Sequence, residues 1–458
     1  MQETVEVDTD YLIIGAGPGG TALAERLSLL GADDVTIVEK GLIGGICVNQ
    51  GCIPIHFALK TLLLKHQISE GILRNKLFNQ VPEIVIPQLR STMEGIQRKI
   101  RFGIKKNLED RGIKFIEGTA NVLTRNKVEI TKNKRVISKL FVRDIIVAAG
   151  AGYTPISVPG VEEVEKSIVP AEQVMTMNFD EVPSEVVVYG VDSPCIEIAV
   201  FFHLLGSEVT ITSPKNNIVS YGSKQLRQSV EDLMEVEGIM IYKNTKIKRF
   251  SMHNTGLKVD ILYQDDKRRQ LSSGMFINAF QKRPNLEWRE ESNFRNPPDN
   301  IYLIGDQKRN NGLPFRSFLS AYEGRILADH IMERDNKIHL DPDLVLCGLT
   351  ALDIQAAKIG LTQEEAAARG IKVKILEIPN GQNAYAQISG QIDGYTMLIV
   401  EDSTERIIGG EIVGIDALNL ITVIGTAIAC NGTLKELRKF PAFHPSLAEG
   451  IFDCAWIK

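Results

Sequence analysis

Short apolar runs separated by a helical pattern open the chain. Residues 11–14 are continuously apolar, residues 21–30 repeat apolar positions with helical spacing, and residues 35–38 form a second apolar run. Continuous apolar runs of this length are typical of buried parallel strands, and the helical pattern between them is typical of a crossover connection. The pattern therefore predicts a strand–helix–strand unit at the start of the chain.

The same pattern returns in the middle of the chain. Residues 186–189 predict a strand, residues 196–205 a helix, and residues 209–212 a further strand. The letters Leu-Leu-Gly and Val-Thr-Ile occur at matching places in the two copies, which indicates an internal duplication. Two units of this kind predict an α/β fold that contains two Rossmann-like domains.

The remainder of the chain departs from this repeat. One more apolar run, at residues 301–304, ends in Gly-Asp and precedes a helical pattern that is expected to extend from Ser317 to Arg334. Beyond residue 341 a capping box at Thr362 predicts the start of a short helix. Apolar runs at 396–400 and 407–413 then predict an antiparallel sheet. We therefore expect a separate α+β domain at the end of the chain.

Composition agrees with an ordinary globular protein. A length of 458 residues favours two to four domains. A hydrophobic content of 44% and a charged content of 24% are usual values. The net charge of -5 gives no electrostatic reason to expect nucleic acid or an anionic membrane as a partner. A basic helical segment at residues 87–109 is interpreted as a solvated face.

Location is judged from the apolar segments and the cysteines. The chain has no run of about 18 apolar residues, so no membrane span is expected, and the apolar segment 418–430 is interpreted as a buried helix. Residues 1–10 are acidic and lack the apolar core of a signal peptide. A cytoplasmic protein is expected, and a close cysteine pair there is more readily catalytic than structural. The scattered cysteines are expected to be small packing residues: Cys195, Cys347, Cys430 and Cys454.

A glycine-rich fingerprint lies between the first strand and the first helix. Gly15 allows a tight turn, Gly17 lets the backbone approach a pyrophosphate, and Gly20 allows close packing of helix on strand. The helix N-terminus faces the phosphates, and Glu39 at the end of the second strand can accept hydrogen bonds from a ribose. This context predicts a bound adenine dinucleotide. The alternative is a glycine-rich turn in an empty Rossmann unit.

Two cysteines lie in a second glycine-rich turn. Cys47 and Cys52 precede a helical pattern at residues 55–65, and a thiol near a helix N-terminus is favoured as the thiolate. Two thiols this close can form a disulfide if the turn brings their Cα atoms to about 5–6 Å. A metal clip or a stapling disulfide are the alternatives. Metal sites usually need a second pair or a histidine cluster, and only His56 stands nearby, so no metal is expected and redox catalysis is favoured.

The order of these motifs resembles one family. Five features occur in this order: the N-terminal fingerprint, the motif Gly-Gly-x-Cys-x-Asn-x-Gly-Cys-Ile-Pro, the second nucleotide-type unit, the Gly-Asp strand and the C-terminal motif His-Pro-Ser-x-x-Glu. Together they resemble the motifs of the class I pyridine nucleotide–disulfide oxidoreductases. Among these, the chain is most similar to the dihydrolipoamide dehydrogenases. The resemblance runs from about residue 8 to the C-terminus, and it implies a homodimer with FAD in each subunit.

The resemblance also implies the domain organisation. It predicts two Rossmann-like nucleotide-binding domains, of FAD and NAD(P) type, and a C-terminal α+β dimerisation domain. We expect an FAD-binding domain with the redox disulfide at residues 1–165, a degenerate NAD(P)-binding-like domain at 166–275, a return segment of the FAD-binding domain at 276–340, and the dimerisation domain at 341–458.

Residue roles follow from the same resemblance. Cys52 would lie against the flavin as its thiolate partner, and Cys47 would exchange with the substrate. His444, acting across the dimer, would be the acid–base for the substrate thiol, and Glu449 would fix its ring. The residues expected to contact FAD are Gly15, Gly17, Gly20, Glu39, Lys40, Gly45, Gly150, Gly305 and Asp306.

Departures from the family pattern cluster on the far side of the flavin. Asp192 and Cys195 stand where the second fingerprint has glycines, and Gln281 stands where the family has another glycine. A carboxylate at the place of close approach would repel a pyrophosphate, so the use of NAD(P) is uncertain, and its binding is expected to be weak, altered or absent. His56 replaces a lysine beside the flavin, and a His56–Glu197 pair would carry a charge that changes near neutral pH.

The favoured function is therefore an FAD-dependent disulfide oxidoreductase. It would pass electrons between a dithiol or disulfide, either small or carried on a protein as a lipoyl-type group, and a second carrier. One alternative is a homologue that has lost the use of NAD(P)H and works with a quinone, a lipoyl protein or an iron–sulfur protein. Another is a redox sensor or scaffold without turnover, against which the presence of both cysteines, His444 and Glu449 argues.

Overall fold

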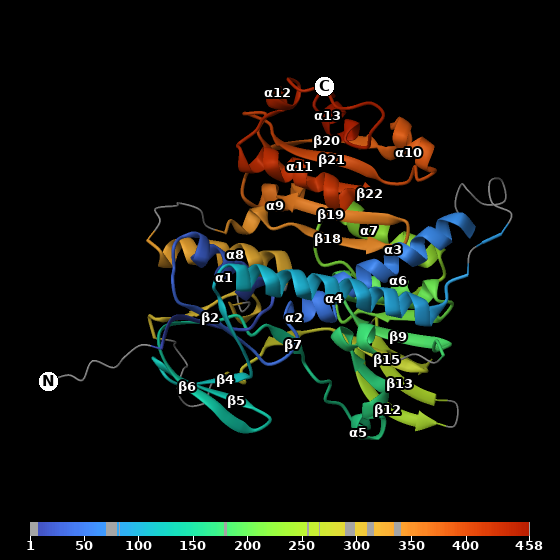
Figure 1. Ribbon diagram of the computed structural model, residues 1–458. Coiled ribbons are helices and arrows are strands. Elements are labelled where there is room, and N and C mark those ends of the chain that lie inside the picture. The colour runs from blue at the N-terminus through green and yellow to red at the C-terminus, as the bar shows by residue number, and fades with distance from the viewer. Residues whose placement is uncertain are drawn as a thin grey trace.

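The computed structural model describes residues 8–69, 80–81, 83–177, 181–253, 256–264, 266–288, 298–308, 316–333 and 340–457. Three sheet-based parts follow one another along the chain (Figure 1). The first two lie beside each other, and the third, red in the figure, lies across one end of the molecule. The mixed α/β architecture predicted from the sequence is confirmed.

The first part is built on a parallel sheet. In sheet order its strands are β3 (Lys114–Glu117), β2 (Val35–Glu39), β1 (Thr9–Ile14) and β6 (Arg135–Val147). β17 (Ile301–Leu303) also pairs with β6, and β5 (Lys127–Lys132), followed by β4 (Thr119–Thr124), extends the sheet from the first half of β6. β6 is long because its first half forms a hairpin with β5 and its second half pairs in parallel with β1 and β17.

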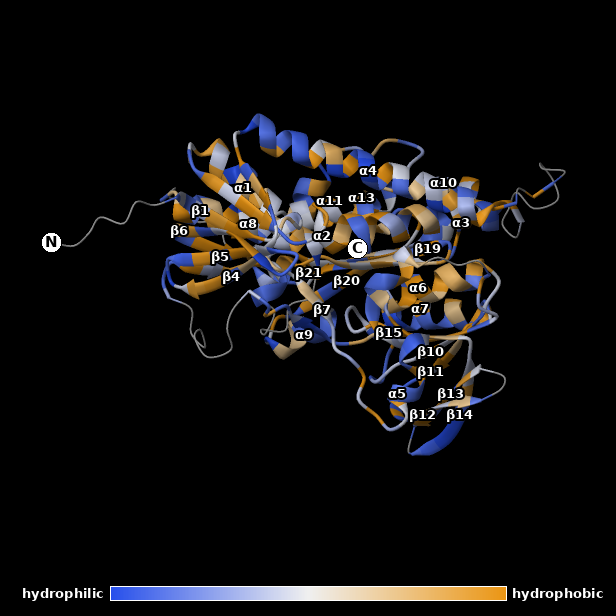
Figure 2. Cartoon of the chain, turned by 60° about the horizontal axis from the view of Figure 1, so that its bottom comes forward, coloured by the Kyte–Doolittle hydropathy of each residue, from blue (hydrophilic) through white to orange (hydrophobic). Residues whose placement is uncertain are grey.

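The strand β1 explains the apolar run at the start of the chain. Ile13 packs into the cluster formed with α1 (Pro18–Leu29), α4 (Ile86–Asp110) and α8 (Ser317–Ile331). Leu12 points to the other face, into a cluster with the β4–β5 hairpin and Trp288. Both faces of the strand are therefore covered, which is why residues 11–14 are apolar at successive rather than alternate positions. In Figure 2 the strands of this sheet are largely orange, whereas α4 carries long blue stretches.

The second part repeats the Rossmann-like architecture. In sheet order its parallel strands are β11 (Met240–Tyr242), β10 (Glu208–Thr212), β9 (Glu185–Gly190), β15 (Met275–Ala279) and β8 (Ile168–Pro170). Its helices are α6 (Asp192–Leu204) and α7 (Lys224–Val236), and an antiparallel sheet follows with β12 (Lys246–His253), β13 (Gly256–Tyr263) and β14 (Lys267–Ser273). β15, which begins at the expected domain boundary at residue 275, pairs with β9 and so belongs to this sheet.

A two-stranded ribbon joins the first two parts. It pairs β7 (Ala151–Tyr153) with β16 (Lys282–Pro284), so the chain crosses from one domain to the other and back along adjacent paths. The short helices of the crossing are α5 (Val161–Val164), η1 (Glu165–Ser167) and η2 (Ala171–Thr176).

The third part is a five-stranded antiparallel sheet. In sheet order its strands are β18 (Cys347–Ala351), β19 (Ile354–Gly360), β22 (Ile407–Gly414), β21 (Tyr395–Glu401) and β20 (Val373–Pro379). The helices of this third part are η4 (Pro342–Leu344), α9 (Gln363–Ala368), η5 (Asn380–Gln382), α10 (Ala384–Ser389), α11 (Ala417–Ala429), α12 (Leu434–Leu437) and α13 (Glu449–Cys454). The predicted capping box is confirmed, since Thr362 and Glu365 bond each other's backbone N–H groups.

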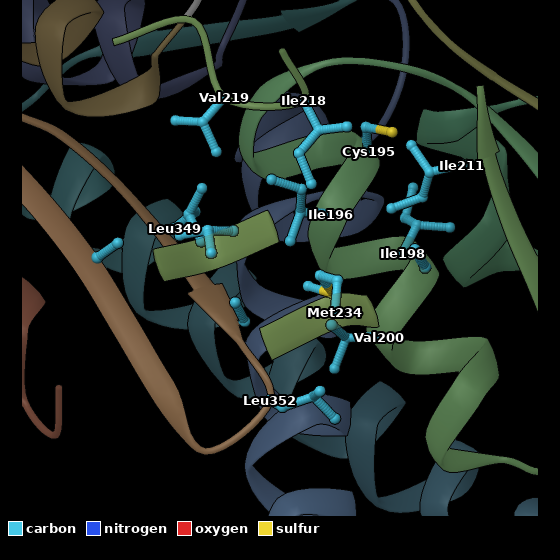
Figure 3. Packing of buried hydrophobic residues seen from close by; sticks show 14 of the residues in the cluster. Cys195, Ile196, Ile198, Val200, Ile211, Ile218, Val219, Met234, Leu349 and Leu352 are labelled. Atoms are coloured by element: carbon cyan, nitrogen blue, oxygen red, sulfur yellow. The ribbon is translucent and has the colours of Figure 1, made fainter. Parts of the chain in front are cut away.

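One hydrophobic core joins three distant parts of the chain. It contains Leu59 from the helix α3 (Cys52–Ser69), Ile196 from α6 and Leu349 from β18. Figure 3 shows Ile196 and Leu349 within this cluster. Figure 3 also shows Ile218 and Val219, which belong to the loop after β10, in the same cluster. α3 begins at a site cysteine, so this core fixes the redox turn against the second domain.

Several predicted details differ in the structure. The helix expected from residue 196 begins at Asp192, because the turn before it is shorter than the sequence match suggested. The interpretation of all four scattered cysteines as packing residues is wrong for Cys430, which is exposed, whereas Cys195 and Cys454 are fully buried. The expected end of the last helix in the first domain, Arg334, lies outside the described residues.

One described helical stretch meets the length and composition expected of a membrane span. It is Gly45–Ser69, which joins α2 (Gly45–Asn49) to α3. α3 packs against α6 and α4 within the fold and contributes to the shared core. Apolar core helices pass the same test, so this stretch is only weak evidence for a span.

Candidate redox-active site

The first glycine fingerprint forms a backbone cradle. Gly15 adopts a left-handed conformation with φ of 109°, and a Cβ atom on Gly20 would lie 2.0 Å from the carbonyl oxygen of Gly15. A Cβ atom on Gly45 would lie 2.9 Å from the Cα atom of Gly17, so the fingerprint loop and the cysteine turn touch backbone to backbone. No side chain fits at these contacts, which leaves the N-terminus of α1 open to a phosphate group.

Glu39 ties the ends of two strands together. Its carboxylate accepts hydrogen bonds from the N–H of Ala16 at 2.7 Å and from the N–H of Gly41 at 2.8 Å. The side chain therefore lies beside the fingerprint loop at the carboxyl end of β2, where a ribose would be bound. The neighbouring Lys40 forms an exposed ion pair with Glu287.

A single large cavity gathers most of the predicted residues. Its volume is about 880 Å³, and it runs from the glycine cradle to the cysteine turn and on to α6. The predicted residues that line it are Gly15, Gly17, Glu39, Lys40, Gly45, Cys47, Cys52, His56, Gly150, Glu197, Gly305 and Asp306. Gly20 is buried behind the cradle, and neither His444 nor Glu449 of the same chain reaches the cavity. A dinucleotide is long and partly apolar, and this cavity, with a phosphate cradle in its wall, fits FAD.

The flavin-side loop is held by the first domain. Gly305 has φ of 61°, its N–H donates to Glu323 at 2.8 Å, and a Cβ atom on it would lie 2.5 Å from Oγ of Ser320. The sequence analysis missed Gln307, whose side chain accepts from the indole N–H of Trp288 at 3.0 Å and donates to the carbonyl of Gly150. These bonds position Asp306 at the cavity wall.

The two cysteines flank the start of α3. Cys47 lies in α2, Cys52 is the first residue of α3, and both are free thiols in the structure. A hydrogen bond from the Cys47 thiol lowers the pKa of Cys52 to about 5, and burial opposes this shift. The same hydrogen bond, together with burial, raises the pKa of Cys47. The reduced pair is therefore one thiol and one thiolate near neutral pH.

Two residues before and in α8 also act on Cys52. Oγ of Ser317 lies 3.6 Å from Sγ of Cys52, and the positive charge of Arg316 also lowers the pKa of that thiol. The sequence analysis did not single out either residue, because they lie more than 260 positions from the cysteine motif and match no motif of their own. Only the packing of α8 on α1 brings them to the redox turn.

α4 anchors the redox turn from outside. The buried side chain of Gln97 donates to the carbonyls of Val48 and Asn49, and Arg101 donates to the side chain of Asn49 at 2.8 Å. The Asn49 amide in turn donates to the carbonyl of Gly45 at 2.8 Å. The interpretation of this basic helix as only a solvated face is therefore wrong for these positions, which hold α2 in place.

His56 and Glu197 lie close to each other beside Cys52. His56 lies one turn after Cys52 on α3, and its Nδ1 is 2.9 Å from the Cys52 carbonyl oxygen. Its Nε2 lies 3.8 Å from Oε1 of Glu197, a side chain of α6 that is only 5% exposed. Burial raises the pKa of Glu197, while the charge of His56 and a hydrogen bond with Ser193 oppose that shift.

His444 and Glu449 form a second polar pair near the C-terminus. Nδ1 of His444 is 2.8 Å from Oε1 of Glu449, and the N–H of Ser446 donates to the other carboxylate oxygen at 2.9 Å. These two contacts hold the pKa of Glu449 below its usual range. The imidazole is 70% exposed, so within one chain it is oriented by Glu449 but faces no substrate.

The start of the second Rossmann unit is filled by its own chain. The N–H of Asp192 donates to the carbonyl of Ile218 at 2.7 Å. The Asp192 carboxylate accepts from the N–H of Ser220 at 2.7 Å and from its hydroxyl at 2.6 Å. Asp192 itself has φ of 63°, the left-handed region that a glycine adopts more readily. The loop after β10 thus covers the N-terminus of α6.

No cluster of metal-binding side chains occurs among the residues that the structure describes.

Comparison with known proteins places the chain in a family. A family model described as pyridine nucleotide-disulphide oxidoreductase matches residues 9–311, and the model of its dimerisation domain matches residues 347–454. A dihydrolipoyl dehydrogenase of Staphylococcus aureus is 25% identical, with 98% of this chain and 96% of the relative covered. Dihydrolipoyl dehydrogenase 3 of Haloarcula marismortui is 26% identical, with the same coverage.

Solved structures share the fold along nearly the whole chain. LpdA from Mycobacterium tuberculosis superposes with a TM-score of 0.85 at 20% identity, covering 98% of this chain and 99% of that one. The flavoprotein disulfide reductase RclA from Escherichia coli, in a Cu(II) complex, gives a TM-score of 0.82 at 19% identity and the same coverage. Since the family model covers well over half of the residues, the chain belongs to the pyridine nucleotide-disulphide oxidoreductases and is an FAD-dependent disulfide oxidoreductase.

Proposed function

We propose that this enzyme oxidises a dithiol of lipoyl type through the Cys47–Cys52 pair. The observation that carries the proposal is the unequal pair of thiols at the start of α3, inside the cavity that fits FAD. The names of the relatives, dihydrolipoyl dehydrogenases, support the class of substrate. FAD supplies the acceptor for one electron pair when it is bound.

The unequal pair also assigns the order of exchange. A substrate thiolate attacks one sulfur of the disulfide, and the reaction is faster when the other sulfur leaves as a thiolate of low pKa. Cys52 has the lower pKa, so attack at the Cys47 sulfur is favoured and Cys52 is the leaving thiolate. Cys47 is then the exchanging residue, and Cys52 stores the electron pair beside the flavin.

The proton of the substrate thiol needs a base, and we assign this role to His444 across a homodimer. Glu449 bonds Nδ1, so Nε2 of the imidazole is the atom left to take the proton. The residue lies outside the cavity of its own chain, and the chain carries the family's dimerisation domain. The active site is therefore completed only by a second copy.

Under this proposal, the second domain lacks the usual binding site for NAD(P)H. A pyrophosphate needs free N–H groups at the start of α6. There the N–H of Asp192 is already bonded, Pro194 has none, and the Asp192 carboxylate is negative. The proposal is that a nicotinamide dinucleotide binds to this domain weakly, in an altered pose or not at all.

Anaerobic titration of the full-length holoenzyme separates these statements. Dihydrolipoamide should reduce the flavin promptly, and NADH and NADPH should not. Cys47→Ser should bind FAD normally but lose reduction by dihydrolipoamide, whereas Cys430→Ser, a matched change at an exposed cysteine away from the cavity, should behave as wild type. Prompt reduction by NADH or NADPH would overturn the NAD(P) statement, and unchanged turnover of the Cys47 variant would overturn the thiol assignment.

A cytoplasmic location is also part of the proposal. Its support is the cysteine usage, since a close pair of catalytic thiols suits a compartment that keeps other thiols reduced. Fractionation of cells that produce the protein, followed by immunodetection, tests this location.

A further inference from the structure

His56 is the feature of the redox site that the proposed function leaves without a task. Its ring lies in the cavity, between the first residue of α3 and a buried carboxylate of α6. Its Nδ1 is 2.9 Å from the carbonyl oxygen of Cys52, and a carbonyl can only accept a hydrogen bond. Nδ1 therefore carries a proton, and Nε2 is the atom that gains or loses one.

Nε2 faces a buried carboxylate that is also stabilised by a hydrogen bond with Ser193 and by the charge of Arg316. Oε1 of Glu197 lies 3.8 Å from it and accepts a long hydrogen bond of 3.3 Å from the N–H of Thr350. The Glu197 side chain is buried, and an isolated buried carboxylate is costly unless a cation or proton compensates for it. A protonated His56 supplies such a cation.

Other charged and titratable groups also line the cavity, among them Cys47, Cys52, Arg316 and Cys347. Cys52 lies on α3 with His56, Cys47 on α2, and Arg316 directly before α8, and the charges of His56 and Arg316 both act on Cys52 and on Glu197. Cys47 already holds the proton of the reduced pair.

Reduction of the Cys47–Cys52 disulfide changes the charge next to His56. The Cys47–Cys52 bond accepts two electrons and one proton and gives one thiol at Cys47 and one thiolate at Cys52. The new negative charge appears one helical turn from His56. A negative charge one helical turn away favours the protonated form of an imidazole, so reduction of the disulfide favours a proton on Nε2.

We propose that His56 holds a second proton of the redox site. Its Nε2 takes up one proton when the Cys47–Cys52 disulfide is reduced and releases it when the disulfide forms again, and Glu197 stabilises the protonated ring. The site thereby exchanges two electrons and two protons, with Cys47 and His56 as the two proton carriers. This inference rests on the proposed function, because it requires the cysteine pair to cycle.

The pH dependence of the cysteine couple tests this directly. The potential of a two-electron couple falls by ~30 mV per pH unit for each proton taken up with the electrons. The wild-type couple is therefore expected to fall by ~60 mV per pH unit around neutral pH, and the His56→Gln couple by ~30 mV. The holoenzyme is equilibrated anaerobically in dithiothreitol redox buffers, quenched in acid and alkylated, and the Cys47 and Cys52 peptides are quantified by mass spectrometry.

A matched control lies on the same helix. His66 lies in α3, its Nε2 is also 3.8 Å from a carboxylate oxygen, that of Asp353, and it does not line the cavity. His66→Gln should keep the wild-type slope. His56→Lys places a permanent cation at the site, so it should show the slope of His56→Gln while keeping the Glu197 charge compensated, and it carries the test if the glutamine variant fails to fold.

The outcomes separate three cases. Equal slopes for the wild type and both His56 variants overturn the inference. Loss of the steeper slope in Glu197→Gln but not in the His56 variants assigns the proton to Glu197 and overturns it as well. A wild-type pair that does not cycle between thiol and disulfide in the buffers overturns the proposed function, and this inference with it.

Discussion

Removal of the Cys47 thiol tests what keeps Cys52 ionised. Cys47→Ala takes away the hydrogen-bond donor that contributes most to the lowered pKa of Cys52, and Cys47→Ser keeps a hydroxyl donor in its place. The two variants differ in one oxygen atom, so the comparison isolates the hydrogen bond from the loss of the disulfide, which both variants share.

The size of the effect follows from the hydrogen bond. The pKa of Cys52 lies at about 5, against an ordinary value of 9.0. A hydrogen bond to a charged group contributes about 1.5–3 kcal/mol, and one pKa unit corresponds to about 1.4 kcal/mol. Loss of the donor should therefore raise the pKa of Cys52 by about one to two units in the alanine variant. The serine variant should stay close to the wild-type value.

The assay follows alkylation of Cys52 against pH. Only the thiolate reacts, so the rate of reaction with iodoacetamide rises with pH through the pKa and then levels off. Peptide mass spectrometry separates Cys52 from Cys430, an exposed thiol that serves as an internal standard. The alanine variant should reach its plateau at a higher pH than the serine variant. Equal midpoints would refute the reasoning and leave Ser317, His56 and Arg316 as the groups that lower the pKa of Cys52.

Four further substitutions have expected outcomes. Gly20→Ala places a Cβ atom 2.0 Å from the Gly15 carbonyl oxygen and should lower stability, measured by thermal unfolding, by about 1–3 kcal/mol. In Gly17→Ala the nearest protein atom to the new Cβ atom is 4.0 Å away, so this variant should stay folded but lose FAD. Glu411→Ala removes the buried carboxylate that accepts hydrogen bonds from the N–H and the hydroxyl of Ser223, the N-cap residue of α7. It should lower the free energy of unfolding in urea by about 1–3 kcal/mol, and an unchanged value would contradict the role of these bonds. His444→Gln should slow dithiol oxidation by about 10²–10⁴-fold and leave the dimer mass unchanged, and equal loss of both would make the residue structural.

The sequence alone determined the parts whose physics is local. The strand, the glycines and the helix around Gly15, Gly17 and Gly20 could be predicted because each residue is dictated by its immediate backbone geometry. The capping box at Thr362 and the antiparallel strands of the third sheet follow from equally local rules. The cysteine motif belongs to the same class, since both thiols lie within one turn.

The sequence also showed that the second nucleotide unit departs from the usual motif, but not which contacts occupy the altered turn. Asp192 stands where a glycine was expected, which predicted repulsion of a pyrophosphate. The structure adds that the chain itself occupies the place, through Ile218 and Ser220 of a loop more than 20 residues away. Hydrogen bonds of this kind depend on loop packing, for which the sequence carries no periodic signal.

Only the tertiary structure decided which groups control the thiols. Arg316 and Ser317 reach Cys52 because α8 packs on α1, and Gln97 reaches the redox turn because α4 packs across α2. The distance of 3.8 Å between His56 and Glu197 likewise depends on the core that α3 and α6 share. Charges and hydrogen bonds act over a few ångströms, and the sequence does not state which distant residues come that close. The sequence thus determined that a cysteine pair and a nucleotide cradle exist, and the packing of helices determined the electrostatic setting in which the pair works.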